Sequence, residues 1–396
     1  MHPSRMLPLN RCLIVLLVAL GSQACGLFQE TRSTRLDRDL PTDACQGRRC
    51  AVSLPVTSFA TCPTGGCDPG NGNGKGIYII NESDYCLRDE GNVPKYCPEA
   101  FINDPRGVAL ELRDAKNPQV VHASPVRAVL VNGTGHEEPV TLVSIRGERT
   151  ELVITYRTAD GQDRTATGAE VSALRLKLVV SRGSDSNLQI HHFELQLRPV
   201  DPNPGLPPGF QRFWVTYRPA GTSDWKPYCL IGDGDTQVSF LGGRRISGLT
   251  AEVENIENVT TMSCETGAID TCLVWGYTPW NPRTGNPEAS DYLFRSCLQA
   301  KRAAYFVGSG DSNSYTKSGT LIVKRDAYGI SKQHLEDLEA LWSPWGAECL
   351  NPEHRRRPEF GLPDPLPAEL PRCTPVQWSE RGKLATGLAP ENHSGR

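Results

Sequence analysis

The chain has 396 residues with 42 basic and 45 acidic side chains, which gives a net charge of −3 at neutral pH. Its basic residues are dispersed apart from the run His354 to Arg357, so we expect no nucleic acid partner. The 37 glycines and 31 prolines exceed the average of soluble proteins but fall short of the content of disordered chains. This composition is typical of a loop-rich β protein.

Residues 1–24 have the pattern of a signal peptide. Arg5 and Arg11 flank an apolar run from Cys12 to Leu20, and small residues follow it. The run has about nine residues where a membrane-spanning helix needs about 20, and no later run comes closer to that length. We therefore expect the segment to direct export and to be removed, and we expect no transmembrane helix.

Cys25 is the candidate lipidation site. The preceding Ser22-Gln23-Ala24 suits an ordinary signal peptidase, while a cysteine at the new first position resembles a bacterial lipobox. A lipobox prefers leucine where this chain has Ser22, so a plain secreted form stays open. Lipidation would anchor the chain to a membrane, with residues 25–44 as a polar tether. The expected location is the bacterial cell envelope or the extracellular space.

The cysteines support the same compartment. The chain has 14; apart from Cys12 and Cys25, twelve remain in two groups of six, with none between residues 97 and 229. Zinc sites would need close C-x-x-C or C-x-x-H pairs, which are missing, so we predict disulfides and no metal site. The predicted disulfide cysteines are Cys45, Cys50, Cys62, Cys67, Cys86, Cys97, Cys229, Cys264, Cys272, Cys297, Cys349 and Cys373.

Residues 45–106 form a cysteine-rich N-terminal unit with little room for a hydrophobic core, so cross-links must supply much of its stability. A short strand is expected at residues 76–80. Residues 71–82 have the spacing of an EF-hand calcium loop, but Lys75 stands among the ligand positions and would repel the cation. We therefore expect a solvated turn there.

Residues 107–200 contain no cysteine and alternate strand-like runs with turn signals, which predicts a β-sandwich-like domain. In the run Leu174 to Val180, apolar side chains alternate with Arg175 and Lys177, as in a half-buried strand. The overall fold class is therefore expected to be mainly β. The candidate strands are Val108 to Leu112, Val126 to Val131, Val140 to Ile145, Glu151 to Tyr156, Leu174 to Val180 and Ile190 to Leu197.

After a proline-rich linker and a strand at residues 201–224, residues 225–350 are expected to form a small α+β module. Strands are predicted at Phe213 to Arg218 and Val238 to Leu241, and amphipathic helices at Tyr292 to Tyr305 and Ser331 to Trp342. Residues 351–396 form a proline-rich tail. We expect Cys373 to return to the body by a disulfide and the last dozen residues to be disordered.

Six ordered landmarks give this module a family resemblance. They are Trp225 to Cys229, Cys264 to Ala268, Cys272 to Trp280, Cys297 leading into Arg302 to Phe306, Thr316 to Ile322, and Glu339 to Trp342 with Gly346 to Cys349. In these the chain resembles the bacterial ADYC-domain family of exported proteins and lipoproteins. The family's name motif falls on Ala303 to Phe306, which here reads Ala-Ala-Tyr-Phe, without the acidic residue or the cysteine. The resemblance implies a location and a fold class but no reaction.

Trp275, Tyr277 and Trp280 are the candidate binding residues. They form an aromatic segment beside Cys272, and the functional interpretation is an exposed platform for a glycan or a protein ligand. The alternative, which we favour, is that the rings form the core of a small disulfide-bonded domain.

Catalytic signatures are sparse. The chain has no G-x-S-x-G, H-E-x-x-H, Walker A or dinucleotide-binding motif, and we expect no cofactor. Ser314 to Lys317 matches S-x-x-K but lies in a loop-like stretch, and His191 and His192 in one strand point to opposite faces. We therefore expect a non-enzymatic cell-envelope lipoprotein that presents a binding or structural surface. A secreted hydrolase of envelope or prey polymers, with a carboxylate-lined cleft, is the alternative.

Overall fold

The computed structural model describes residues 86–116, 120–182, 188–201, 209–231, 234–246, 251–265, 267–306, 322–335, 337–356, 370–374 and 383–388, with Leu206 and Thr316. The predicted signal peptide, Cys25, the tether and the first four disulfide cysteines (Cys45, Cys50, Cys62 and Cys67) lie outside these residues, as does the strand expected at 76–80. Within the described ranges no helix has the length and apolar character needed to cross a membrane.

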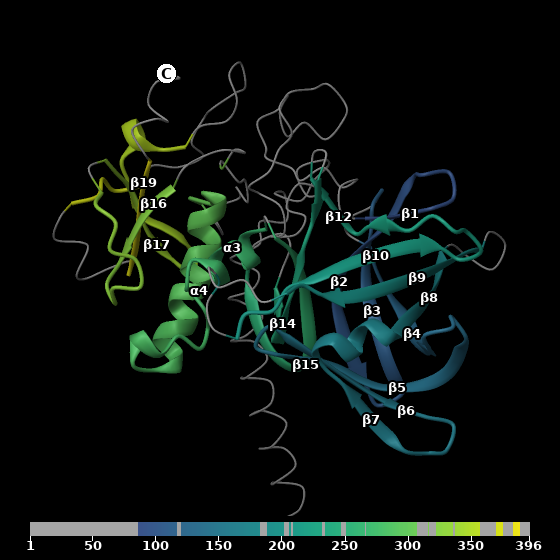
Figure 1. Cartoon of the computed structure of the whole chain (residues 1–396). Coiled ribbons are helices and arrows are strands. Elements are labelled where there is room, and N and C mark those ends of the chain that lie inside the picture. Colours follow the sequence, from purple (N-terminus) through teal and green to yellow (C-terminus); the bar gives the residue numbers. More distant parts are fainter. Residues whose placement is uncertain are drawn as a thin grey trace, which may run out of the picture.

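Most of the described strands join one large antiparallel sheet (Figure 1). Its members are β1 (Leu87–Arg88), β2 (Pro94–Asp104), β3 (Gly107–Asp114), β4 (Val121–Val131), β5 (Glu137–Glu148), β6 (Glu151–Arg157), β7 (Asp163–Ala166), β8 (Leu174–Arg182), β9 (Gln189–Pro199), β10 (Phe213–Pro219), β11 (Lys226–Pro227), β14 (Val238–Ile246) and β15 (Val253–Cys264). The main path runs β1-β2-β15-β14-β10-β9-β8-β4-β5-β6-β7. The sheet thus combines strands from the cysteine-rich unit, the middle domain and the C-terminal module.

Strand β3 closes the large sheet on itself. It pairs with β2 on one side and with β4 on the other, so the path from β2 through β15, β14, β10, β9, β8 and β4 returns to its start. Alternate side chains then share one interior. In β8, Leu174, Leu176, Leu178 and Val180 are at most 1 % exposed. The mainly β fold and the six strands predicted between residues 107 and 200 are confirmed.

Two helices lie between the large sheet and a small one (Figure 1). Asn286 caps the longer helix by accepting a hydrogen bond from the Ala289 N–H at 2.7 Å, and Ala303 ends it in a left-handed conformation. The helix predicted from Tyr292 is confirmed and starts earlier. The remaining elements are η1 (Gly168–Ala173), β12 (Cys229–Ile231), β13 (Gly234–Thr236), α3 (Ala268–Val274), η2 (Pro282–Thr284), α4 (Pro287–Arg302), β16 (Ile322–Asp326), β17 (Leu338–Ser343), β18 (Gly346–Leu350), η3 (Pro352–His354) and β19 (Leu384–Leu388).

The helix predicted at Ser331 to Trp342 is wrong, because the end of this segment is strand β17. Its side chains are buried on both faces: Ala340 and Trp342 join the main core, while Leu341 joins a second small core with Cys349 and Ala385. A strand buried on both faces shows no period of two. Its spacing of apolar residues therefore resembled that of a helix.

The prediction that the last dozen residues are disordered is wrong for residues 385–388. They belong to β19, which pairs with β16 and β17 inside the small sheet. Trp342 Nε1 donates a hydrogen bond to Thr386 Oγ1 at 2.7 Å. Tertiary pairing thus orders a segment whose own sequence, Leu-Ala-Thr-Gly-Leu, has little local signal.

Four disulfides cross-link the described residues, and each joins cysteines of one predicted group. Cys272–Cys297 joins α3 to α4, and the Cα atoms of the two residues are 5.9 Å apart. The others are Cys86–Cys97, Cys229–Cys264 and Cys349–Cys373. The disulfide prediction is confirmed for these eight cysteines, including the return of Cys373 to the body.

Candidate ligand-binding site

The predicted aromatic segment lies mainly against the core. Tyr277 is fully buried, and its hydroxyl donates a hydrogen bond to Asp326 Oδ2 at 3.1 Å. Trp275 and Trp280 are half-buried and pack on the edge of the main core. Tyr277 therefore offers no exposed ring to a ligand, which agrees with the core interpretation, whereas the two tryptophans keep some exposed area.

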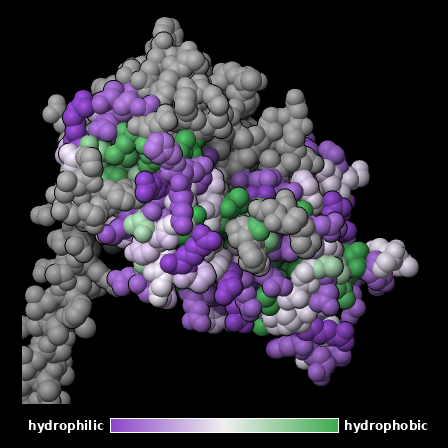
Figure 2. Space-filling model, turned by 60° about the vertical axis from the view of Figure 1, so that its left-hand side comes forward, coloured by the Kyte–Doolittle hydropathy of each residue, from purple (hydrophilic) through white to green (hydrophobic). Residues whose placement is uncertain are grey.

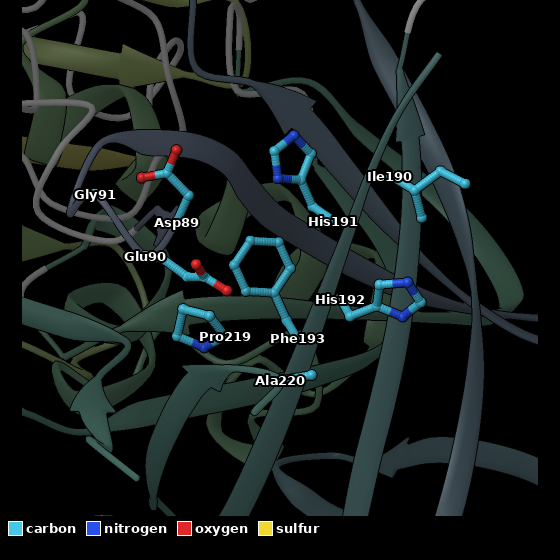
Figure 3. Close-up of a pocket in the computed structure, with 9 residues that line it drawn as sticks. All are labelled: Asp89, Glu90, Gly91, Ile190, His191, His192, Phe193, Pro219 and Ala220. Atoms are coloured by element: carbon cyan, nitrogen blue, oxygen red, sulfur yellow. The ribbon is translucent and has the colours of Figure 1, made fainter. Parts of the chain in front are cut away.

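A pocket of about 450 Å³ lies between the turn after β1 and strand β9 (Figure 3). Asp89 and Glu90 line one side of it, and β9 contributes His191 and His192, whose rings point to opposite sides of the strand as expected. His191 is half-buried and His192 is exposed. The pocket thus presents two neighbouring carboxylates, the group that the hydrolase alternative requires.

Asp89 is already engaged within the protein. Its carboxylate accepts a hydrogen bond from the Val93 N–H at 2.9 Å and lies 3.2 Å from Lys95 Nζ. Burial raises the pKa of Asp89, but these two contacts outweigh burial and hold the pKa below its usual value. Since a glycosidase needs one carboxyl group that can donate a proton, Asp89 does not suit that role. Asp89 therefore does not supply the proton donor that the hydrolase alternative needs, and the hydrolase stays a prediction.

A larger pocket, about 870 Å³, opens where β3 and β5 separate along one edge of β4. β3 pairs with β4 as far as Pro125, and β5 begins to pair with it at Ala128. Between these two ladders, Val126 and Arg127 have no strand beside them on that edge. The gap gives access to apolar side chains of the interior, since Val126, Ala128, Val108, Val140 and Leu142 are all buried and all line the pocket.

Charged side chains line the same pocket, which we call the β4 pocket. Arg106 forms an ion pair with Asp104 at 2.9 Å, and Lys177 lies 2.7 Å from a carboxylate oxygen of Glu137. Arg127 forms no ion pair within the described residues, and its side chain is exposed. The arrangement is an apolar interior with one guanidinium available at the wall, which suits an apolar ligand with an acidic group.

On the face that Figure 2 shows, described hydrophobic residues form small separate groups among hydrophilic ones. Among the described residues, no group of three or more His, Cys, Asp and Glu side chains is placed to hold a metal ion. The β4 pocket is therefore the best candidate site.

Sequence reasoning did not single out any residue of the β4 pocket. Its lining comes from β2, β3, β4, β5, β8 and the turn between β2 and β3, which only the tertiary structure brings together. One signal was present: Arg127 lies between apolar strand residues that the alternation places on the opposite face. Such an arginine is more often a solvated surface residue, so its position marked no site.

A family model matches the C-terminal part of the chain. Residues 168–356 match the model of a family described as the ADYC domain. The chain carries an ADYC domain. The domain includes η1 and extends to Arg356, so it starts before residue 225, where we expected the module to begin. Among the residues of the β4 pocket, only Lys177 belongs to it. No curated protein and no solved structure matches the chain.

The segment Ala303 to Phe306, on which we expected the ADYC name motif to fall, lies in the core. Tyr305 is 1 % exposed, its hydroxyl hydrogen-bonds to the Glu339 carboxylate, and it accepts a hydrogen bond from the Arg356 N–H at 2.9 Å. Ala303 and Ala304 are also buried. In this chain the segment therefore contributes to packing, and its side chains are not presented to a ligand at the surface.

Proposed function

We propose that this protein is an exported binding protein whose ligand occupies the β4 pocket. The observation that carries the proposal is the gap between β3 and β5 along the edge of β4, which exposes part of an apolar interior. A volume of about 870 Å³ falls in the usual range for small-molecule sites, roughly 300–1,000 Å³. The site has apolar walls and few polar groups, which is the usual composition of a binding pocket.

The ligand would be a small amphipathic molecule with an apolar body and one acidic group. Val126, Ala128 and Leu142 would contact the apolar body. Arg127, which has no ion pair among the described residues, would contact the acid. This replaces the wider expectation of a protein or glycan ligand with a specific chemical class.

Export and anchoring belong to the same proposal. The signal-peptide pattern of residues 1–24 supports export, and disulfides form in oxidising compartments outside the cytosol. A lipid on Cys25 would place the protein in a bacterial cell envelope. In a bacterial host, the wild type should sediment with membranes, and Cys25→Ala should be released as soluble protein. Retention of Cys25→Ala with membranes would contradict the anchor.

The ligand proposal is tested by binding of dodecanoate and of dodecanol, which share an apolar chain and differ in charge. Both should bind the wild-type protein saturably in calorimetry. Arg127→Glu should weaken dodecanoate binding by about tenfold or more and leave dodecanol binding unchanged, because only dodecanoate has an acidic group. Arg164→Glu, at an exposed position of β7 outside the pocket, is the matched control.

A second variant tests the pocket itself. Ala123 is exposed and lines the pocket, so Ala123→Trp should fill the mouth and abolish binding of both compounds without disturbing the core. Ala159→Trp, in the exposed turn after β6, should bind them as the wild type does. Equal affinity in Ala123→Trp and Ala159→Trp, or no saturable binding to the wild type, would overturn the proposal.

A further inference from the structure

Two lysine ammonium groups lie close to the ring of Trp275. Trp275 ends α3, Lys301 lies in the last turn of α4, and Lys324 lies in β16. Lys324 Nζ is 4.1 Å from the centroid of the indole ring, and Lys301 Nζ is 5.5 Å from it. Three elements separated in sequence thus bring two ammonium groups to one aromatic side chain, all within the ADYC domain.

Lys301 is unusual because its side chain is almost completely buried, at 6 % exposure. Its backbone is fixed, since its carbonyl accepts hydrogen bonds from Thr316 Oγ1 and from Arg356 Nη1. Burial, together with the positive charges of Arg356 and Lys324, lowers the pKa of Lys301 to about 7. Burial also lowers the pKa of Lys324 to about 8.

The charged groups near these lysines do not neutralise them. Arg356 is a cation, and its guanidinium binds both carboxylate oxygens of Glu339, so that carboxylate is already engaged. Neither lysine forms an ion pair within the described ranges of the chain. The indole ring offsets part of the cost, since the negative face of its π system attracts a cation. A buried ammonium without a counter-ion remains unfavourable, and a second one beside it adds repulsion.

We propose that Lys301 and Lys324 bind an oxyanion, a carboxylate or a phosphate group, beside the Trp275 ring. The anion would supply the negative charge that the described residues do not provide, and it would favour the protonated form of both lysines. The site is distinct from the β4 pocket, whose residues apart from Lys177 lie outside the ADYC domain. It also gives Trp275 a different role from a glycan platform, since the ammonium groups approach its ring.

The test compares thermal unfolding of the full-length mature protein with phosphate, with acetate and with sodium chloride at equal ionic strength. Phosphate at ten times its dissociation constant should raise the Tm of the wild type by about 2 °C relative to chloride. Lys301→Met and Lys324→Met should lose this rise. Lys332→Met, which removes an exposed lysine from the neighbouring turn, should keep it. If acetate raises the Tm as phosphate does, the site accepts carboxylates. If only phosphate raises the Tm, the site is specific for phosphate groups.

Two further measurements keep the proposal falsifiable if a variant folds poorly. Without added anion, Lys301→Met should unfold at a Tm equal to or above that of the wild type, because it removes an uncompensated buried charge. For the wild type, the stabilisation by sulfate, whose charge is constant, should decline between pH 6 and pH 9 as both lysines lose their protons. The proposal would be overturned if phosphate raised the Tm equally in the wild type and in the three lysine variants. A stabilisation by sulfate that does not change with pH would also overturn it.

Discussion

Glu339 and Arg356 form a two-point ion pair inside the C-terminal part of the chain. Arg356 Nε donates to Glu339 Oε1 at 2.8 Å, and Nη2 donates to Oε2 at 2.9 Å. Both side chains are at most 2 % exposed. Thr386 Oγ1 also donates to Oε2 at 2.7 Å. The pair therefore ties β17, the segment after η3 and β19 together.

Removing one partner of this pair should strongly destabilise the protein. Glu339→Leu leaves the Arg356 guanidinium buried without a counter-charge, so the free energy of unfolding should fall by about 3–5 kcal/mol. The control is Arg372→Ala, which removes one partner of the surface ion pair with Glu353. The side chain of Arg372 is 68 % exposed and that of Glu353 is 42 % exposed, so the free energy of unfolding should fall by less than about 1 kcal/mol. Urea unfolding followed by circular dichroism measures both. Similar losses for the two variants would contradict the prediction.

Asp270 should make stability depend on pH in the acid range. Burial raises its pKa to about 6, although hydrogen bonds from Arg212 and Ser239 oppose the rise. The unfolded carboxyl titrates near pH 4, so between about pH 4 and pH 6 the native state holds the proton more tightly. The stability that this group contributes is therefore present below pH 4 and is lost as pH rises through 6.

The measurement is the free energy of unfolding of the wild type relative to Asp270→Asn across this range. The difference should change by up to about 3 kcal/mol between pH 4 and pH 6, with the wild type losing stability relative to the variant. Asp163→Asn, at an exposed ion pair with Arg157, should show no change of this sign. A flat difference for Asp270→Asn would show that folding does not raise the pKa of this carboxyl.

A close approach between β5 and β14 requires glycine at position 242. A Cβ atom at Gly242 would overlap the backbone of Gly147 on β5. Gly242→Ala should therefore force the two strands apart and lower the free energy of unfolding by about 1–3 kcal/mol. A Cβ atom at Gly133 would meet no atom within 4 Å, so Gly133→Ala should change stability by less than about 0.5 kcal/mol. Equal Tm values for both variants would contradict this packing.

The Cys272–Cys297 disulfide should supply a large share of the stability of the helical region. It closes a loop with a sequence separation of 25, for which the chain-entropy relation gives about 3.5 kcal/mol. The double variant Cys272→Ser with Cys297→Ser should therefore lower Tm and expose α3 to proteolysis before the large sheet. Peptide mapping without reduction should also recover this pair. Another partner for Cys272 in that map would refute the assignment.

Local pattern predicted the strands between residues 107 and 200 well, because one face of each is buried and the other is not. The Leu174 to Val180 run is the clearest case. The same reasoning failed at β17, where both faces are buried, and at β19, whose order depends on pairing with β16 and β17. The candidate sites were not predictable in this way, since the role that we propose for Arg127 depends on the gap between β3 and β5.

The sequence by itself determined that this chain is mainly β, that its cysteines form two groups, and which strands and which helix its periodicity supports. Only the tertiary structure decided which cysteines pair, that β3 closes the large sheet, and that Lys301 and Lys324 both lie near the Trp275 ring. The physical reason is that residue spacing records how each side chain is buried along one element. It does not record which distant element lies opposite, and the pockets and charge clusters depend on that neighbour.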